Sequence, residues 1–231
     1  MKKKVLIIDN EDQSEEIEQL IRDAGKKGIG LECEQFKVGS TEETGLLTNG
    51  KIDLSKVIKA YKERYRGTTF NLVAFDWDLN DDNIDGIELL RCFTYYKIFR
   101  NTKKVLYSGL LEIKLSSMLD DFKDNKIKKD FILKRIKTLV NADIIGFVER
   151  ENYDKFIISA LEKMDDSIDF ILEDELSKFP DLQFKGAIGH PSFRCKTYSE
   201  IIEIITNNDH LRNDLKRELI QHSMAYMTEN L

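Results

Sequence analysis

Three short apolar segments of this sequence end in side chains that could do chemistry together. The segments span residues 5–8, 72–75 and 105–107. A continuous apolar run of this length is typical of a strand that is buried on both faces of a parallel sheet, and ligands bind at the carboxyl ends of such strands. The polar side chains that follow the three runs belong to Asp9, Asn10, Glu11, Asp76 and Ser108.

If the three strands are parallel neighbours, these side chains converge at one edge of the sheet. Carboxylates that lie close together repel one another unless a cation lies between them. Oxygen atoms are the ligands that Mg²⁺ prefers, whereas soft metals favour sulfur. The sequence therefore predicts a divalent cation, best matched by Mg²⁺, at this edge of the sheet.

The segments between the apolar runs have the helical spacing that the crossovers of a parallel sheet require. Five strand-like segments alternate with helix-like segments, which predicts an α/β fold with a right-handed, doubly wound parallel sheet. Gly86 precedes the third helix, where a glycine indicates either a positive φ or close packing. The predicted strands are residues 5–8, 31–38, 72–75, 105–107 and 142–148, and the predicted helices are residues 14–24, 54–65, 87–93 and 153–164.

Two connections are longer than this architecture requires, near residues 39–50 and residues 110–140. The second holds two predicted helices joined by a polar segment at residues 120–125, and it either forms a partner surface or extends the core. Beyond residue 164 the strand pattern stops, and helical stripes predict an extension over residues 165–231. The sequence thus predicts a domain of residues 1–164 followed by a helical extension, whose stripes we expect to pack within it.

The composition limits the classes of partner. The chain has 231 residues, with 36 Lys and Arg against 42 Asp and Glu, so its formal net charge is −6. This charge gives no broad attraction to nucleic acid or to an anionic membrane surface. The first apolar run is too short for a signal peptide or a membrane span. We therefore expect a cytoplasmic protein that binds neither membrane nor nucleic acid.

The three cysteines, Cys33, Cys92 and Cys195, are odd in number and lie far apart in the sequence. None has a second cysteine or a histidine at a spacing suited to zinc. We interpret all three as buried thiols in a reducing compartment.

Together these motifs resemble the receiver domains of bacterial two-component response regulators. The resemblance covers roughly residues 2–164 and implies a flavodoxin-like, CheY-like fold that takes part in a phosphorelay. In that family the third strand ends in an aspartate that accepts a phosphoryl group. The segments that carry the resemblance are residues 5–11, 75–79, 84–90, 105–109 and 146–150.

The resemblance implies a role for each site residue. Asp76 would be the phosphoacceptor, Ser108 would bind and report the phosphoryl group, and Arg150 would supply its positive charge. The Mg²⁺ ion would be held by oxygen atoms of Asp9, Asn10, Glu11, Asp76 and Asp78, the last through its backbone carbonyl group. The chain would be a phosphoacceptor with at most self-phosphorylation and autodephosphorylation chemistry.

The partners that the resemblance implies are proteins. A histidine kinase or a phosphotransfer protein would supply the phosphoryl group. An output protein would bind the helical insertion or the C-terminal helices, and a homodimer is an alternative.

The sequence departs from the family pattern at three places, which keeps two alternatives open. Asn10 replaces the second acid, the loop after Asp76 is longer and lacks the usual proline, and Arg150 followed by Glu151 replaces a Lys-Pro pair. These departures favour a pseudo-receiver that binds partners without being phosphorylated. The spacing of Asp76 and Asp78 also fits a phosphohydrolase of the haloacid-dehalogenase type, whose further acids would come from residues 165–174.

Overall fold

The computed structural model describes residues 2–39, 44–164, 168–184, 191–207 and 209–229. The chain divides into two compact units. The larger comprises residues 1–64 and 70–166, and the smaller comprises residues 65–69 and 167–231.

The larger unit is built around a five-stranded parallel sheet with the strand order β2-β1-β5-β6-β7. Every neighbouring pair of strands is parallel. In chain order this is the 2-1-3-4-5 arrangement of a flavodoxin-like, doubly wound fold, so the predicted fold class is confirmed. The strands are β1 (Lys3–Asp9), β2 (Leu31–Lys37), β5 (Leu72–Asp76), β6 (Lys103–Ser108) and β7 (Ile144–Glu149).

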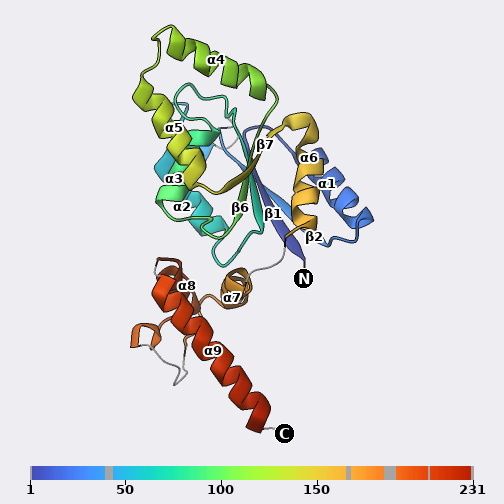
Figure 1. Ribbon diagram of the computed structural model, residues 1–231, viewed down its shortest axis with the longest axis vertical. Helices are drawn as coiled ribbons and strands as arrows, with labels where there is room; N and C mark the ends of the chain where they lie inside the picture. The colour runs from blue at the N-terminus through green and yellow to red at the C-terminus, as the bar shows by residue number, and fades with distance from the viewer. Residues whose placement is uncertain (1, 40–43, 165–167, 185–190, 208, 230–231) are drawn as a thin grey trace. The chain divides into compact units, whose positions relative to one another are not determined.

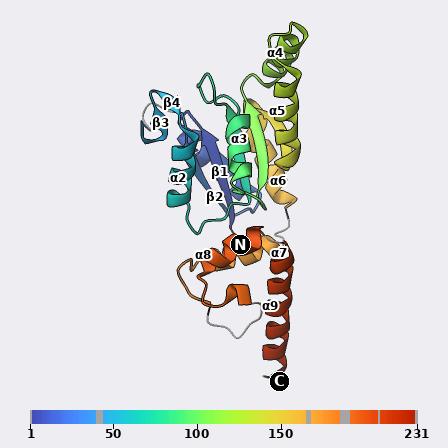
Figure 2. The same ribbon diagram turned by 90° about the vertical axis from the view of Figure 1, so that its left-hand side faces the viewer.

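Helices cover both faces of the sheet, as Figures 1 and 2 show. The apolar stripes of the helices and the continuous apolar runs of β1 and β5 require this three-layer arrangement, because both faces of those strands must be removed from water. On one face lie α1 (Ser14–Lys26) and α6 (Tyr153–Glu162). On the other face lie α2 (Leu54–Arg64), α3 (Gly86–Tyr95) and α5 (Lys129–Asn141).

An aromatic cluster packs the end of β5 against the helices of one face. The Phe75 ring on β5 lies 5.9 Å from the Phe93 ring on α3, and Phe93 stacks on Phe99 at 5.1 Å between ring centroids. Tyr61 on α2 meets Phe93 edge to face at 5.2 Å. Such aromatic pairs stabilise beyond the area that they bury. They fix the position of Phe75 and thus of the next residue, Asp76.

Both predicted insertions form ordered structure in the described residues. The first contains a short antiparallel pair, β3 (Leu47–Thr48) and β4 (Lys51–Ile52). Its Ile52 amide donates to the Asp81 carboxylate at 2.8 Å. The same carboxylate accepts from the amides of Asn83 and Ile84, so Asp81 joins the loop after Asp76 to this insertion.

The second insertion forms two helices, as predicted. These are α4 (Leu111–Lys123) and α5, which we call together the α4–α5 hairpin. Helix α4 continues through residues 120–123, which the sequence had indicated as part of a polar connection. The difference arises because Lys123 pairs with Asp120 on the same helix face at 2.9 Å, and such a pair is compatible with a helix end.

The smaller unit contains α7 (Ile168–Ser177), α8 (Tyr198–Asn207) and α9 (Asp209–Glu229). Its core consists of Phe193, Ile201, Ile205 and Leu215. The apolar stripes of this region thus pack within the unit in part, whereas Ile168, Ile171, Ile220 and Met224 are exposed. Residues 65–69 also belong to the smaller unit, which the sequence did not indicate. The Thr69 hydroxyl group donates to Asp174 of α7 at 2.9 Å.

Two further expectations concern exposure. Cys92 is buried and Cys33 is partly buried, but Cys195 is exposed, so the interpretation of all three cysteines as buried thiols is wrong for Cys195. Within the described residues, no helix combines the length and the apolar character that a bilayer crossing requires.

Gly86 lies in close contact with the end of β5. It begins α3, its amide donates to the Trp77 carbonyl at 2.9 Å, and a Cβ atom there would overlap the Asp76 carbonyl group. Close packing, rather than a positive φ, thus requires this glycine. We expect Gly86→Ala to lower the free energy of unfolding by about 1–3 kcal/mol in urea denaturation.

The control is Gly25→Ala in α1, where an added Cβ atom meets nothing within 4 Å. We expect this variant to be as stable as the wild type or up to about 1 kcal/mol more stable, because alanine favours a helix. Equal effects of the two substitutions would contradict the close approach of Gly86 to β5.

Candidate functional site

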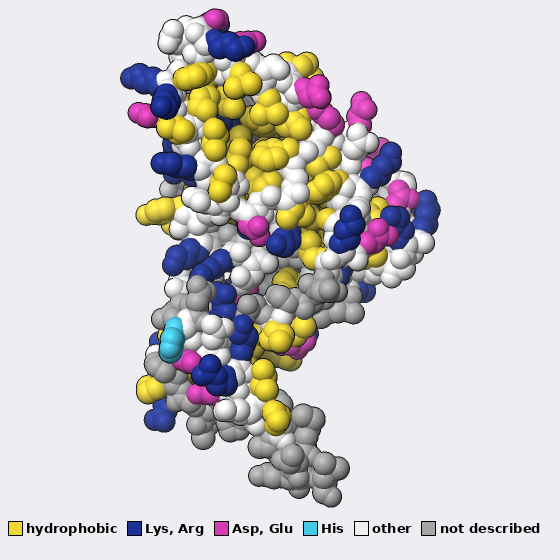
Figure 3. All heavy atoms as spheres, in the orientation of Figure 1, with side chains coloured by type: hydrophobic (Ala, Val, Ile, Leu, Met, Phe, Trp, Pro, Cys, Tyr) yellow, Lys and Arg dark blue, Asp and Glu magenta, His cyan; other side chains and the backbone are white. Residues whose placement is uncertain are grey.

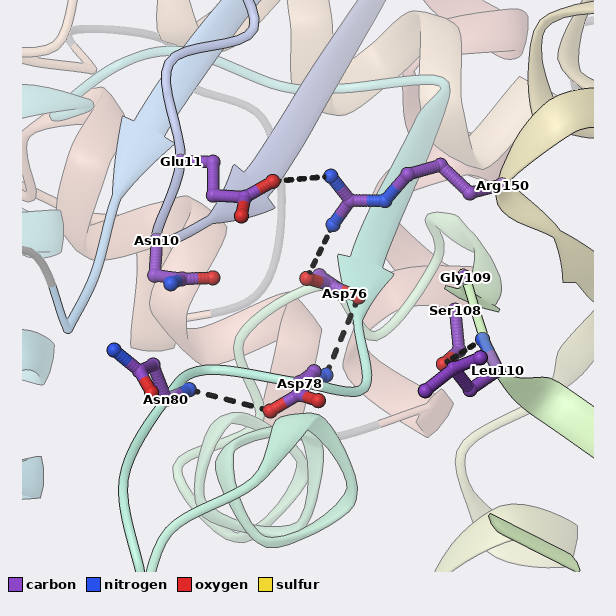
Figure 4. Close-up of a pocket in the computed structure, with 9 residues that line it drawn as sticks. All are labelled: Asn10, Glu11, Asp76, Asp78, Asn80, Ser108, Gly109, Leu110 and Arg150. Carbon is purple, nitrogen blue, oxygen red and sulfur yellow. Dashed lines mark hydrogen bonds and ion pairs between the residues drawn. The ribbon is translucent and has the colours of Figure 1, made fainter. Parts of the chain in front are cut away.

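An open cavity of about 450 Å³ lies at the carboxyl end of the sheet (Figure 4). Six of the seven predicted site residues line it, and the seventh, Asp9, is fully buried beside it. The lining residues are Asn10, Glu11, Asp76, Asp78, Asn80, Ser108, Gly109, Leu110 and Arg150.

The register of the sheet brings these side chains together. Ile8 on β1 is opposite Phe75 on β5, so the next residues of the two strands, Asp9 and Asp76, leave the sheet at the same level. Asp76 is in turn opposite Tyr107 on β6, which places Ser108 one step further at the edge of the cavity. The predicted convergence of the strand ends is thus present.

Arg150, which follows β7 directly, lies between the acidic side chains. Its Nη2 atom is 2.7 Å from Asp76 Oδ2 and 3.2 Å from Asp9 Oδ2, and its Nη1 atom is 2.6 Å from Glu11 Oε2. Figure 4 shows the guanidinium group reaching between Glu11 and Asp76. A cation of the chain itself therefore lies between the carboxylates, and their mutual repulsion alone no longer requires a metal ion.

Burial sets the protonation of the two strand-end carboxyl groups. Asp76 is 1% exposed, and burial together with the charge of Asp9 raises its pKa to about 7, although Arg150 acts in the opposite direction. Burial also raises the pKa of Asp9, against the hydrogen bond from Tyr107. The candidate nucleophile is thus only partly ionised at neutral pH.

Tyr107 supports Asp9 from below the cavity. Its hydroxyl group donates to Asp9 Oδ2 at 2.6 Å, and burial with the nearby carboxylates raises the pKa of Tyr107 well above its ordinary value. Sequence reasoning counted Tyr107 only as an apolar strand residue. The signal that could have identified it is its hydroxyl group, because a tyrosine buried in an aliphatic strand needs a hydrogen-bond partner.

Lys114 on α4 holds the residue two positions after the candidate nucleophile. Its ammonium group pairs with Asp78 Oδ2 at 2.8 Å and thereby lowers the pKa of Asp78. The Asp78 amide donates to Asp76 Oδ1 at 3.2 Å. Lys114 of the inserted hairpin thus holds Asp78, and the Asp78 amide in turn orients the Asp76 carboxylate.

Arg135 on α5 makes a second contact of this kind. Its guanidinium group pairs with Asp85 and lies over the Trp77 ring, 5.8 Å from its centroid. The indole of Trp77 donates to the same Asp85 carboxylate at 3.2 Å. Both helices of the α4–α5 hairpin are therefore attached to the loop that follows Asp76, through residues that sequence reasoning did not identify.

The orientation of the Asn10 amide determines whether its oxygen can bind a metal ion at this site. One terminal atom of this amide lies 3.2 Å from Asp9 Oδ1 and 2.8 Å from the Asp78 carbonyl oxygen. An amide nitrogen at that position donates to both oxygens, whereas an amide oxygen there forms an oxygen cluster that a cation would stabilise. A metal ion bound through the Asn10 oxygen would therefore have to replace these two hydrogen bonds.

The donor set is consistent with Mg²⁺, since it offers the Asp9 and Asp76 carboxylates, the Asn10 amide and the Asp78 carbonyl group. Among the described residues, no group of three or more Asp, Glu, His or Cys side chains is arranged as a metal site. Glu11 pairs with Arg150, and the Asp78 carboxylate pairs with Lys114. These two carboxylates are therefore weaker candidates than the four oxygen groups.

Comparisons with known proteins find similar chains among solved structures. No protein-family model matches the sequence, and no curated protein matches it. Similar solved structures include the receiver domain of the Francisella response regulator 1452, with 13% identity over 70% of this chain and 94% of that chain and a TM-score of 0.38.

Two other similar structures are a receiver domain and a chemotaxis protein. The NtrX receiver domain from Brucella abortus is 16% identical over 69% of this chain and 95% of that chain, with a TM-score of 0.38. The chemotaxis protein CheY4 of Vibrio cholerae is 10% identical over 71% of this chain and 98% of that chain, with a TM-score of 0.38. At these values the likeness carries no argument about chemistry. The receiver-like fold rests on the strand order and on the helices of the two faces.

The raised pKa of Asp76 predicts a pH-dependent effect of Asp76→Asn. The folded protein keeps this proton up to pH about 7, whereas the unfolded chain releases it near the ordinary value of 3.8. This group therefore makes the wild type less stable as the pH rises from about 4 to 7. We expect urea denaturation to show that Asp76→Asn is more stable than the wild type by about 1–3 kcal/mol at pH 8, with a smaller difference at pH 5.

Asp78→Asn is the control with the opposite sign, because the pKa of Asp78 is lowered. It should reduce stability at neutral pH and have less effect in acid, where the wild-type carboxyl group is protonated as well. A stability difference for Asp76→Asn that does not vary with pH would contradict the raised pKa.

The attachment of the hairpin at Asp85 predicts that two neighbouring cations of α5, Arg135 and Lys134, contribute differently to stability. Arg135→Ala should lower the free energy of unfolding by about 1–3 kcal/mol, because it leaves the Asp85 carboxylate without the cation that pairs with it. Lys134→Ala removes an exposed pair at 3.5 Å from Glu88 and should change stability by at most about 0.5 kcal/mol. The chain has one tryptophan, so a change of its emission in Arg135→Ala alone would locate the effect at Trp77. Equal effects of both substitutions would show that α5 is not held at Asp85.

Proposed function

We propose that this chain is a receiver-type signalling protein in which Asp76 accepts a phosphoryl group. One observation carries the proposal. The Asp76 carboxylate lies at a strand end in an open cavity, with the Arg150 guanidinium group 2.7 Å away and Ser108 in the same wall. A nucleophile, a fixed cation and a hydroxyl donor are the groups that phosphoryl transfer to a carboxylate needs.

In the proposed reaction, an oxygen of ionised Asp76 attacks the phosphorus atom of a phosphohistidine or a small phosphodonor. The new O–P bond forms as the bond to the donor atom breaks, and the leaving group keeps the electron pair. Arg150 neutralises charge on the phosphoryl oxygens, and the Ser108 hydroxyl group donates to one of them. Only the ionised fraction of Asp76 reacts, so the rate should rise with pH around the pKa of about 7.

Mg²⁺ would be held by the Asp9 and Asp76 carboxylates, the Asn10 amide oxygen and the Asp78 carbonyl group. When bound, it supplies further positive charge for the phosphoryl oxygens. The Tyr107 hydroxyl group holds Asp9 in place, and the Asp78 amide orients Asp76. The donor of the phosphoryl group would be a histidine kinase or a phosphotransfer protein.

A second candidate function is that of a pseudo-receiver, which binds partners without being phosphorylated. Arg150 favours it, because its contacts with Asp9, Asp76 and Glu11 already neutralise the acidic cluster without a metal ion. The phosphohydrolase alternative is disfavoured. Its second acid must carry a proton, but Lys114 lowers the pKa of Asp78. Of its further candidate acids, residues 165 and 166 lie outside the described residues.

The deciding experiment measures the intact mass of the full chain after incubation with acetyl phosphate and Mg²⁺. We expect one added phosphoryl group on the wild type and on Asp82→Asn, which changes an exposed acid of the next loop, and none on Asp76→Asn. Labelling should be faster at pH 8 than at pH 6. No added mass, under conditions that label a known receiver, would favour the pseudo-receiver. Label that persists in Asp76→Asn would exclude Asp76 as the acceptor.

A further inference from the structure

A second cavity, of about 500 Å³, lies between α3 and α5 and shares no lining residue with the Asp76 site. We call it the α3–α5 groove. Its walls come from the last turns of α3 and from most of the length of α5. The residues that matter for its chemistry are Arg91, Tyr95, Leu133, Lys134 and Lys137.

The groove has an apolar wall that is open to solvent. The Tyr95 side chain is 76% exposed and Leu133 is 39% exposed. Ile136 and Val140, on the same helix α5, are exposed as well but do not line the groove. Figure 3 shows further hydrophobic side chains over the region of α4, α5 and β7, outside the residues that line the groove. The apolar part of the groove is therefore the pair Tyr95 and Leu133, which gives room for one apolar side chain of a ligand.

The rim of the groove is basic, although the protein is acidic. Arg91, Lys134 and Lys137 line it, against one acid, Asp130. Glu88 holds the Arg91 guanidinium group and lies 3.5 Å from Lys134. Within the described part of the chain, Lys137 forms no ion pair. Residues 110–141 hold eight Lys and Arg against five Asp and Glu, in a chain whose net charge is −6.

We propose that the α3–α5 groove is a docking site for an acidic peptide segment of a partner protein. An apolar side chain of the segment packs beside Tyr95 and Leu133, and carboxylates on either side of it pair with Lys134 and Lys137. Charge complementarity favours this occupant over a second copy, because a two-fold contact between copies would bring two basic rims together. The proposal does not depend on the phosphorylation of Asp76.

The groove is held in its shape before a ligand arrives. Arg135 follows Lys134 on α5, and its guanidinium group is paired with Asp85 at the start of α3. The two helices that form the groove are thus joined by an ion pair at the start of α3. A preformed groove loses less conformational entropy when it binds a peptide.

The test selects peptides from a displayed library of random dodecapeptides on the immobilised full chain. We expect the enriched peptides to place Asp or Glu on both sides of Leu, Phe or Trp. Fluorescence anisotropy should show that they bind about tenfold more weakly to the Lys134→Glu, Lys137→Glu double variant. Their affinity should fall with rising salt, because Lys134 and Lys137 are exposed to solvent.

The matched control is the Lys59→Glu, Lys155→Glu double variant, which makes the same charge change at exposed positions of α2 and α6. It should bind the selected peptides as the wild type does. Tyr95→Ala, at a position too exposed to affect folding strongly, should also weaken binding.

Three results would overturn the proposal. Selected peptides could lack an acidic bias, or they could bind both double variants equally. The wild type could also sediment as a dimer that the Lys134→Glu, Lys137→Glu substitutions dissociate, which would make a second copy the occupant.

Discussion

The site depends on one guanidinium group that lies between carboxylates at the ends of parallel strands. Asp9 is fully buried and Asp76 is 1% exposed, and removing a carboxylate from water costs several kcal/mol unless a partner compensates. Arg150 contacts both of them and also Glu11. Without this contact, the two buried acids would have to keep a proton at neutral pH or pair with another cation.

The same arrangement determines what the site can do. Because burial outweighs the effect of Arg150, the carboxyl group of Asp76 keeps a raised pKa, and its reactivity becomes sensitive to pH near neutrality. Its other oxygen is oriented by the Asp78 amide, and Asp78 is held by Lys114 of the inserted hairpin. A change of charge at Asp76 therefore acts on Asp78, which is ion-paired with Lys114 of α4. Trp77 and Asp85 extend this connection to Arg135 of α5. This gives the enlarged hairpin a physical route to the site.

Much of this architecture could be predicted from the sequence because it depends on local patterns. The apolar runs that end in Asp9, Asp76 and Ser108 specify three parallel strands, and their shared edge follows from the geometry of the sheet. The chemical nature of the cation between the acids could not be predicted in this way. Repulsion between carboxylates requires positive charge but does not distinguish a metal ion from a guanidinium group.

The supporting contacts were also beyond sequence reasoning, for a related reason. Lys114 lies 36 residues from Asp78 and Arg135 lies 50 residues from Asp85, so no periodicity links the partners. Both cations occur on helices that also carry other Lys and Arg side chains, which are mostly exposed. Only the packing of the α4–α5 hairpin selects these two from the others. Tyr107 was missed because its ring fits the apolar pattern of a strand, and that pattern does not show that its hydroxyl group donates to Asp9.

The most direct measurement of the central claim is a carboxyl ¹³C NMR titration of Asp76 in the wild type, Arg150→Met and Arg150→Lys. The account predicts a pKa of about 7 in the wild type, a higher pKa in Arg150→Met, and a value near that of the wild type in Arg150→Lys, because a positive charge is restored. A pKa of Asp76 that stays the same or falls in Arg150→Met would contradict the claim that Arg150 is the cation on which the acidic strand ends depend.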